Sequence, residues 1–244
     1  GLVGSLLVGI ETARTLSLLW EKPLIPVNHL VAHIYANWLT GEPELPALAL
    51  VVSGGHTDLV LMRGHGKIEW IGGTRDDAAG EAFDKCARLL GLSYPGGPSI
   101  SAAAKKYLQT SAINHQPLIM FPRPMIDDDS FDWSFSGLKT AVLRTVENHK
   151  STINIPQLAA EVQEAIVDVL VEKTLRAVRK FKPKSLLLAG GVAANSRLRD
   201  KFELAISHQS LTVDFRVPPP KLCTDNAAYI AGYAYFANSS SRWE

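Results

Sequence analysis

The chain has 244 residues, a hydrophobic content of 46% and a formal net charge of +1. This composition is typical of a globular protein with a substantial core, arranged as one large domain or two smaller lobes. The near-neutral charge excludes a global attraction to nucleic acid or to a membrane surface, so a nucleic-acid partner needs a local patch. Cys86 and Cys223 are too few for a disulfide framework and indicate a reducing, cytoplasmic setting. No apolar run is long enough to span a bilayer.

The first 110 residues alternate apolar segments with turns rich in glycine and proline. Helical spacing of apolar residues predicts a first helix, whose small residues would allow close packing. Asp76 and Asp77 are expected to cap a later helix, which Gly91 would end. The predicted elements are helices over 1–20, 29–39, 78–90 and 99–108, a short buried strand over 24–27, and a β-meander over 47–52, 58–63 and 67–71.

The rest of the chain contains several strand–turn–helix units. Segment 112–132 is polar, contains prolines and is expected to be irregular. A long amphipathic helix with one apolar stripe is predicted over 157–180. The other predicted elements are helices over 138–148, 196–207 and 225–237 and strands over 185–189 and 213–217. Together these elements predict an α/β fold, compatible with two related lobes.

Two histidines four residues apart make the first candidate site. His29 and His33 would lie on one face of the predicted helix, because four residues are about one helical turn. Two neutral imidazoles and a carboxylate suit a divalent transition metal with open coordination positions. Ordinary hydrogen-bonded histidines remain the alternative. Asp225 is either a helix cap or a functional carboxylate, and Cys223 is either a thiolate ligand or a small buried side chain.

Two glycine turns, each directly after an apolar strand, are candidate anion-binding loops. The first is Ser53-Gly54-Gly55 after Val51-Val52, and the second is Gly190-Gly191. Glycine allows backbone N–H groups to approach an anion closely, and a helix after the second turn adds its dipole. Two tight turns without a ligand are the alternative, and neither sequence is a P-loop or a dinucleotide-binding fingerprint.

Other polar residues keep two interpretations each. Asp84 either accepts hydrogen bonds from ribose hydroxyls or pairs with Arg88 one turn later. Asn195 is either a helix cap or an adenosine contact. A basic cluster is either the solvated face of the long helix, which we favour, or a phosphate-binding patch for a polynucleotide. The cluster consists of Lys173, Arg176, Arg179, Lys180, Lys182 and Lys184.

Seven motifs, in this order, resemble those of the tRNA N6-adenosine threonylcarbamoyltransferase family of the bacterial TsaD type, formerly labelled O-sialoglycoprotein endopeptidase. They occupy residues 28–33, 52–57, 76–85, 94–98, 135–140, 189–195 and 223–226 and so extend over most of the chain. The resemblance implies an actin-like ATPase fold of the sugar kinase, Hsp70 and actin class, with two lobes around a nucleotide cleft. It also implies transfer of threonylcarbamoyl from threonylcarbamoyl-AMP to N6 of the adenosine next to the anticodon in tRNAs that read ANN codons.

The resemblance also implies roles for individual residues. His29, His33 and Asp225 would hold one divalent metal per chain, with iron(II) expected and zinc as the alternative. The implied substrate and nucleotide contacts are Val51, Val52, Ser53, Gly54, Gly55, Asp84, Gly97 and Asn195. No protein nucleophile is evident, so direct transfer assisted by the metal is the hypothesis.

The resemblance further implies partner subunits and the part of the family's length that this chain covers. A paralogous dimerising subunit and a small ATPase subunit are expected beside tRNA. The strand hairpin with a Gly-Ile-Glu-Thr-Ser-type loop that opens members of this family is not found here. Residues 1–244 are therefore expected to form one catalytic module, shortened at the N-terminus and slightly at the C-terminus, with an incomplete first lobe.

Two other functions compete with the transferase. A zincin metalloprotease needs a glutamate directly after the first histidine, but Leu30 follows His29. A non-catalytic nucleotide-binding scaffold of the same fold would have no reason to keep two histidines and an aspartate in ligand positions. Both are therefore less favoured than the enzyme.

Overall fold

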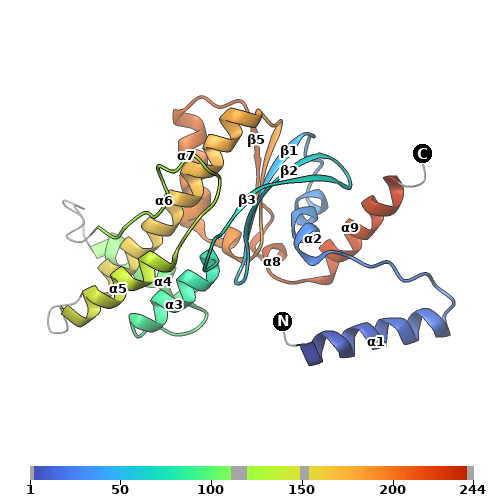
Figure 1. Ribbon diagram of the computed structural model, residues 1–244, viewed down its shortest axis with the longest axis horizontal. Helices are drawn as coiled ribbons and strands as arrows, with labels where there is room; N and C mark the ends of the chain where they lie inside the picture. Colours follow the sequence, from blue (N-terminus) through green and yellow to red (C-terminus); the bar gives the residue numbers. More distant parts are fainter. Residues whose placement is uncertain (1–2, 111–119, 149–153, 241–244) are drawn as a thin grey trace.

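A five-stranded mixed sheet forms the centre of the protein (Figure 1). The computed structural model describes residues 3–110, 120–148 and 154–240. The strand order is β3-β2-β1-β4-β5, and the expected meander is formed by β1 (Ala47–Val52), β2 (Thr57–Gly64) and β3 (Lys67–Gly73). β4 (Ser185–Ala189) and β5 (Asp214–Arg216) extend the sheet in parallel on the other side of β1.

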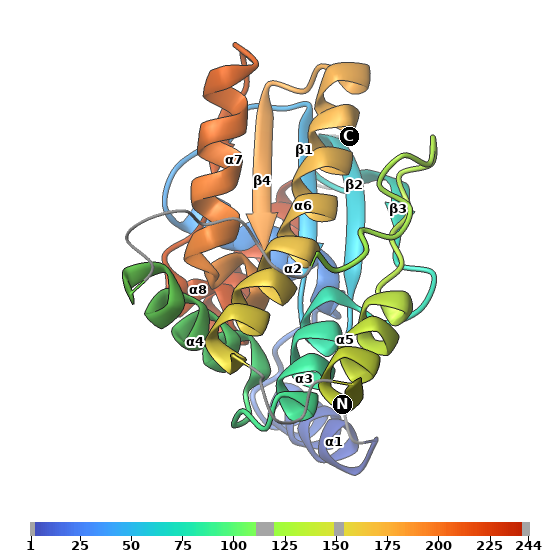
Figure 2. The same ribbon diagram turned by 90° about the vertical axis from the view of Figure 1, so that its left-hand side faces the viewer.

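Helices cover both faces of the sheet, which explains why β1 and β4 are buried along their whole length and consist almost entirely of apolar residues (Figures 1 and 2). Leu48, Leu50 and Val52 of β1 point into the larger core. Ala47 and Ala49 alternate with them and point into a second core on the opposite face. The helices over the larger core are α3 (Ala79–Leu89), α4 (Gly96–Thr110), α5 (Ser136–Asn148), α6 (Ile155–Phe181) and α7 (Ser196–His208). The other face carries α2 (His29–Tyr35), η1 (Ala36–Leu39) and α9 (Ala227–Ser240), and two short elements, η2 (Gly191–Ala194) and α8 (Pro220–Cys223), complete the described part.

The first helix lies apart from these layers (Figure 1). α1 (Val3–Leu19) has no buried residue, and a Cβ added at Gly4 or Gly9 would meet nothing within 4 Å, so the expected close packing is not observed. The strand predicted over 24–27 is wrong. Leu24 and Ile25 are exposed, and this segment pairs with none of the described strands because Pro23 and Pro26 lack the N–H groups that a ladder needs.

The helix-capping prediction for Asp76 and Asp77 is also wrong. Ala78 is the N-cap residue of α3, and Asp77 pairs with Lys85 (2.6 Å). The Asp76 carboxylate instead accepts hydrogen bonds from the backbone N–H groups of Phe135 and Ser136 at the start of α5. A capping carboxylate can serve a helix distant in the chain, which local sequence cannot indicate.

The other predicted elements agree with the structure to within a few residues. α6 matches the predicted amphipathic helix, and the Asn154 side chain caps its first turn by accepting a hydrogen bond from the Gln157 N–H. Residues 111–119 of the segment expected to be irregular lie outside the described residues, and 120–132 contain neither helix nor strand. Within the described part, no helix is long and apolar enough to cross a membrane.

Candidate functional site

Helix α2 positions the two histidines. The Asn28 side chain caps α2 by accepting hydrogen bonds from the N–H groups of Leu30 (3.0 Å) and Val31 (3.2 Å), so the helix begins at His29. His29 and His33 then lie one turn apart, with ring centroids separated by 4.6 Å. His33 is 2% exposed and His29 is 53% exposed, so the pair runs from the interior to the surface.

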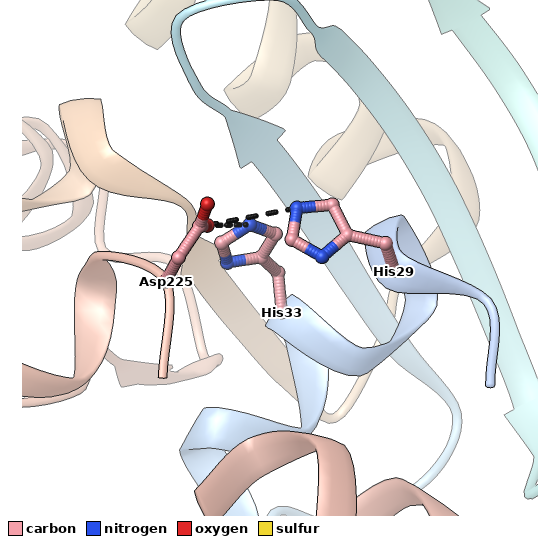
Figure 3. Close-up of side chains that lie close together, drawn as sticks. All are labelled: His29, His33 and Asp225. Atoms are coloured by element: carbon pink, nitrogen blue, oxygen red, sulfur yellow. Dashed lines mark ion pairs between the residues drawn. The ribbon is translucent and has the colours of Figure 1, made fainter. Parts of the chain in front are cut away.

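Asp225 approaches the histidines from the loop between α8 and α9 (Figure 3). Its Oδ1 atom is 3.6 Å from His29 Nε2 and 3.3 Å from His33 Nε2. One potential metal-binding atom from each of the three residues lies within 4.8 Å of the others. Asn226 rather than Asp225 caps α9, accepting hydrogen bonds from the N–H groups of Ala228 and Tyr229. The Asp225 carboxylate is therefore available to the histidines.

Tyr229, which the sequence reasoning missed, completes this cluster. Its hydroxyl donates a hydrogen bond to Asp225 Oδ1 (3.2 Å) and lies 3.4 Å from His33 Nε2. The side chain is buried, and burial raises the pKa of Tyr229 to about 12, so the hydroxyl is neutral near pH 7. The signal was its place four residues after Asp225, near the start of a predicted helix.

The electrostatics favour metal binding by neutral imidazole. Burial, followed by the neighbouring His29, lowers the pKa of His33, and Asp225 only partly opposes this shift. His33 is therefore uncharged near pH 7 and keeps a lone pair for a cation. Two imidazole nitrogens and one carboxylate oxygen fit a borderline divalent metal such as iron(II) or zinc, so the donor set suits the expected metal.

Cys223 is held away from this cluster. Its side chain is buried, its Sγ accepts a hydrogen bond from Arg199 Nη2 (3.3 Å), and it donates to the Pro218 carbonyl oxygen (3.4 Å). Burial raises the pKa of the thiol, which disfavours a thiolate. The structure therefore agrees with the small buried side chain rather than with a thiolate ligand.

The two glycine turns meet because β1 and β4 are parallel neighbours. Val51 of β1 lies opposite Ala189 of β4, so Ser53-Gly54-Gly55 and Gly190-Gly191 leave the same edge of the sheet. Gly190 has φ +89° and packs directly on the carbonyl oxygen of Val52. A side chain at this position would overlap that oxygen, so glycine is required for the close approach.

A cavity of about 650 Å³ opens beside these turns. Of the eight predicted substrate and nucleotide contacts, Gly54, Asp84, Gly97 and Asn195 line it. Val51 and Val52 are buried within β1 and are not part of the lining, and neither are Ser53 and Gly55. The sequence reasoning missed a further group of polar lining residues, which includes Tyr94, Ser101, Lys105, Ser196 and Thr224.

Asp84 and Asn195 each have a structural role beside the cavity. Asp84 Oδ1 accepts a hydrogen bond from the Gly96 N–H (2.7 Å), which fixes the loop before α4. Asn195 caps α7 by accepting from the Leu198 N–H (3.1 Å). Asn195 Nδ2 also donates to Gln163 Oε1 (3.1 Å). The capping alternative for Asn195 is thus observed, and both side chains still reach the cavity.

Lys173 and Arg176 belong neither to a solvated face nor to a free phosphate patch, whereas the other four residues of the basic cluster are exposed, as the favoured interpretation predicted. Lys173 is fully buried and donates hydrogen bonds to the carbonyl oxygens of Ser130 and Asp132. Arg176 donates to two backbone carbonyls of the 120–132 segment, and Arg179 pairs with Glu172. Lys173 and Arg176 thus fasten that segment onto α6, and Arg179 also donates a hydrogen bond to the Gln209 side chain at the end of α7. Sequence spacing alone could not reveal such carbonyl partners.

Known structures share this fold. The chain is similar to HypF of T. kodakarensis, with a TM-score of 0.67 and 14% identity over 93% of this chain and 39% of that one. It is also similar to component A of the Acidaminococcus fermentans (R)-2-hydroxyglutaryl-CoA dehydratase, with a TM-score of 0.51 and 13% identity over 87% of this chain and 68% of that one. At such identities the likeness establishes the α/β fold and nothing about activity.

Sequence relatives identify the family. Residues 1–232 match the TsaD family, described as tRNA N6-adenosine threonylcarbamoyltransferase, and the chain belongs to this family. Proteins of that name from Thermomicrobium roseum and Dehalococcoides mccartyi strain BAV1 are 51% and 52% identical to it, each over 97% of this chain and over 69% and 68% of their own lengths. The counterpart from Halalkalibacterium halodurans is 49% identical over 96% of this chain and 66% of its own length. The predicted family and enzyme class, a transferase, are confirmed, and the chain spans about two thirds of these relatives.

Proposed function

We propose that this chain transfers the threonylcarbamoyl group from threonylcarbamoyl-AMP to N6 of the adenosine next to the anticodon in tRNAs that read ANN codons. One observation carries the proposal beyond family membership. The metal-donor cluster and the nucleotide-sized cavity share one loop, in which Thr224 lines the cavity and Asp225 faces the histidines. A donor molecule that combines a nucleotide and an acyl group can therefore extend from one to the other. The sheet and its helical layers agree with the actin-like ATPase fold that we propose for it.

The metal centre orients and activates the acyl donor in this proposal. His29, His33 and Asp225 would hold one divalent ion, with iron(II) proposed and zinc as the alternative. When bound, such an ion supplies Lewis-acid polarisation of a phosphate or carbonyl oxygen. The neutral His33 imidazole and the single carboxylate leave the centre with a net positive charge, which favours an anionic substrate group there.

The cavity residues hold the nucleotide part of the donor. The glycines at positions 54, 97 and 191 line the cavity, and an added Cβ at each would meet nothing within 4 Å. Their backbone groups are thus open to the ligand, and N–H groups in such loops stabilise charge on a leaving phosphate. Asp84 and Asn195 line the same cavity, which supports the roles proposed for them: the Asp84 carboxylate would accept hydrogen bonds from ribose hydroxyls, and Asn195 would contact the base.

We infer direct transfer without a covalent protein intermediate. The adenosine N6 amine attacks the carbamoyl carbon, a C–N bond forms, the C–O bond to phosphate breaks, and AMP leaves as N6 loses a proton. The thiols do not compete as nucleophiles, because burial raises the pKa of Cys86 to about 12 and also raises the pKa of Cys223. A trapped acyl-protein species would contradict this inference.

The partners follow from the same proposal. The substrates are tRNA and threonylcarbamoyl-AMP, and a paralogous dimerising subunit and a small ATPase subunit are proposed from the family resemblance. Transfer to tRNA also supports a cytoplasmic location. Within this assembly, residues 1–244 would act as one catalytic module.

Elemental analysis of anaerobically purified protein tests the metal centre. We expect nearly one metal ion per chain in the wild type and loss of that ion in His29→Ala and His33→Ala. His29 is half exposed, so its removal should leave the fold intact, which circular dichroism would verify. His208→Ala is the matched control, because this exposed histidine ends α7 away from the cluster. A folded wild type without metal would contradict the centre and favour a nucleotide-binding scaffold.

A transfer assay tests the reaction itself. Purified chain, threonylcarbamoyl-AMP and an ANN-reading tRNA should yield modified adenosine, detected by mass spectrometry of the digested tRNA. The proposed partner subunits are added in a parallel reaction. The histidine variants that lose metal should lose product, and the His208→Ala control should retain it. Product formation at wild-type rate by a metal-free variant would refute the role assigned to the ion.

A further inference from the structure

We propose that the phenol oxygen of Tyr229 is a fourth protein ligand of the metal, beside His29, His33 and Asp225. This inference rests on the metal centre of the proposed function and assigns a residue that the family motifs do not include. Tyrosine oxygen is an established protein ligand of iron, so the chemistry has precedent. The inference concerns this chain, because it depends on where Tyr229 lies on α9.

The distances among the donor atoms carry the argument. Ligands bound at about 2.1 Å around a tetrahedral metal lie about 3.4 Å from one another. The Tyr229 oxygen is 3.2 Å from Asp225 Oδ1 and 3.4 Å from His33 Nε2. The same carboxylate oxygen is 3.3 Å and 3.6 Å from the two histidine nitrogens. The phenol oxygen is therefore spaced from two of the three donors as a fourth vertex would be.

The surrounding structure holds the phenol in this position. Tyr229 is 1% exposed, and its ring lies 4.7 Å from the His33 ring, centroid to centroid. Asn226 caps α9 through the Tyr229 N–H, which fixes the helical turn that carries the ring. Tyr229 also packs with Ala32 and Ala36 in a small core between α2 and α9. The hydroxyl is thus positioned by the fold and needs no large movement to reach a metal.

Ligation changes the charge of the site in a predictable way. A bound metal would displace the phenol proton of Tyr229, and this proton would have a route to solvent past Asp225, whose side chain is 80% exposed. The four residues would then offer two anionic oxygens and two neutral nitrogens to the ion. Because anionic oxygen donors stabilise iron(III) more than iron(II), iron(III) is the state in which this ligand would be detected, while iron(II) remains the state proposed for the transfer reaction. A site built only from His29, His33 and Asp225 lacks this second anion.

Visible absorption of the iron(III)-loaded full chain tests the proposal. A phenolate bound to iron(III) gives a broad visible charge-transfer band, which imidazole and carboxylate ligands do not give. We expect the band in the wild type and its complete loss in Tyr229→Phe, which keeps the ring and its packing. Iron content is measured on the same samples, and near-stoichiometric iron in the variant would show that only the phenolate is missing. The melting temperature of each protein verifies folding.

Tyr233→Phe is the matched control. Tyr233 lies one turn later on α9, and its ring packs on Tyr35, 5.0 Å away, rather than on the histidines. The control should retain the band. Resonance Raman spectra of the wild type, excited in the band, should contain tyrosine ring modes, a readout that needs no variant.

Three results would overturn the proposal: bound iron(III) without a band, a band that persists in Tyr229→Phe, or no bound iron at all. The first two would leave the metal centre and the transfer reaction standing, because iron content and product formation are measured separately. The last would overturn the metal centre as well.

Discussion

Replacement of Gly190 by alanine should be far more damaging than alanine at another glycine with positive φ. Gly190 has φ +89° and ψ 168°, a backbone region that is essentially restricted to glycine. Forcing a residue with a Cβ into this region costs about 1–3 kcal/mol. The added Cβ would also overlap the Val52 carbonyl oxygen at the end of β1, which is backbone held in the sheet and cannot turn away. Such overpacking adds about 1–3 kcal/mol, so we expect a total near 4 kcal/mol.

Gly66 provides the matched control for this argument. It has φ +75° in the β2–β3 turn, and an added Cβ would meet nothing within 4 Å. Gly66→Ala therefore carries the conformational cost alone, about 1–2 kcal/mol. The two variants should differ by about 2–3 kcal/mol, which corresponds to roughly 4–12 °C in melting temperature for a chain of this size.

Thermal unfolding followed by circular dichroism measures both variants, and isothermal titration with AMP measures the cavity at a temperature where each is folded. Gly190→Ala should also weaken AMP binding, because relief of the overlap must separate the two glycine turns beside the cavity. Gly66→Ala should bind as the wild type does. Equal destabilisation by the two substitutions would refute the close-approach argument. Unchanged AMP binding in Gly190→Ala would refute the role of this contact in shaping the cavity.

Three further predictions concern one hydrogen-bonded carboxylate and two buried side chains. Burial alone would raise the pKa of Asp76, but hydrogen bonds at the start of α5 outweigh this effect and lower the pKa. The ionised Asp76 carboxylate therefore stabilises the folded state. This stabilisation is complete above about pH 4 and is lost as pH falls through the folded-state pKa. Acid titration of the unfolding free energy should therefore fall less steeply in Asp76→Asn than in the wild type, and Asp127→Asn at an exposed site should leave the slope unchanged. Lys173→Met should lower the free energy of unfolding, measured in urea, by about 2–4 kcal/mol, because the carbonyl oxygens of Ser130 and Asp132 lose their donor. Lys67→Met, at the surface, should change it by less than about 0.5 kcal/mol. The Cys86 thiol, with its pKa raised to about 12, should react with Ellman's reagent at pH 8 only after denaturation, and rapid reaction of native protein at both cysteines would contradict its burial.

The sequence was most informative where local chemistry decides the structure. β1 and β4 match their predicted limits because each is a mainly apolar run that follows a proline or lysine and leads into a turn containing two glycines. The histidine pair followed from helical spacing, which depends on nothing outside α2. The sequence predicted the two glycine turns as separate anion-binding loops, and it is the parallel pairing of β1 with β4 that brings them together. Asp225 came into the site only through the family resemblance.

Long-range contacts explain what the sequence could not indicate. Lys173 reads as part of a basic surface, yet its ammonium group lies in the core on the carbonyls of a segment some 40 residues away. Asp76 reads as the cap of α3, yet it serves α5, about 60 residues further on. The apolar residues at 24–27 look like a buried strand, but burial requires a neighbour, and the described sheet offers none beside them. In each case the partner, not the residue itself, decides the role.

The arrangement of the site suggests why nucleotide binding and metal geometry should be coupled. The histidines belong to the face of the sheet covered by α2 and α9, whereas the cavity is lined mainly from the α3 and α4 side. The two meet where the chain passes from α8 to α9, with Thr224 on the cavity and Asp225 on the histidines. A ligand that moves Thr224 must therefore move the Asp225 carboxylate, while the Asn226 cap keeps α9 and Tyr229 in place. Coupling through so short a segment needs no domain motion. The distances between neighbouring donor atoms range from 3.2 to 3.6 Å, so a displacement of the Asp225 carboxylate by a few tenths of an ångström would already change the geometry of the metal-donor cluster.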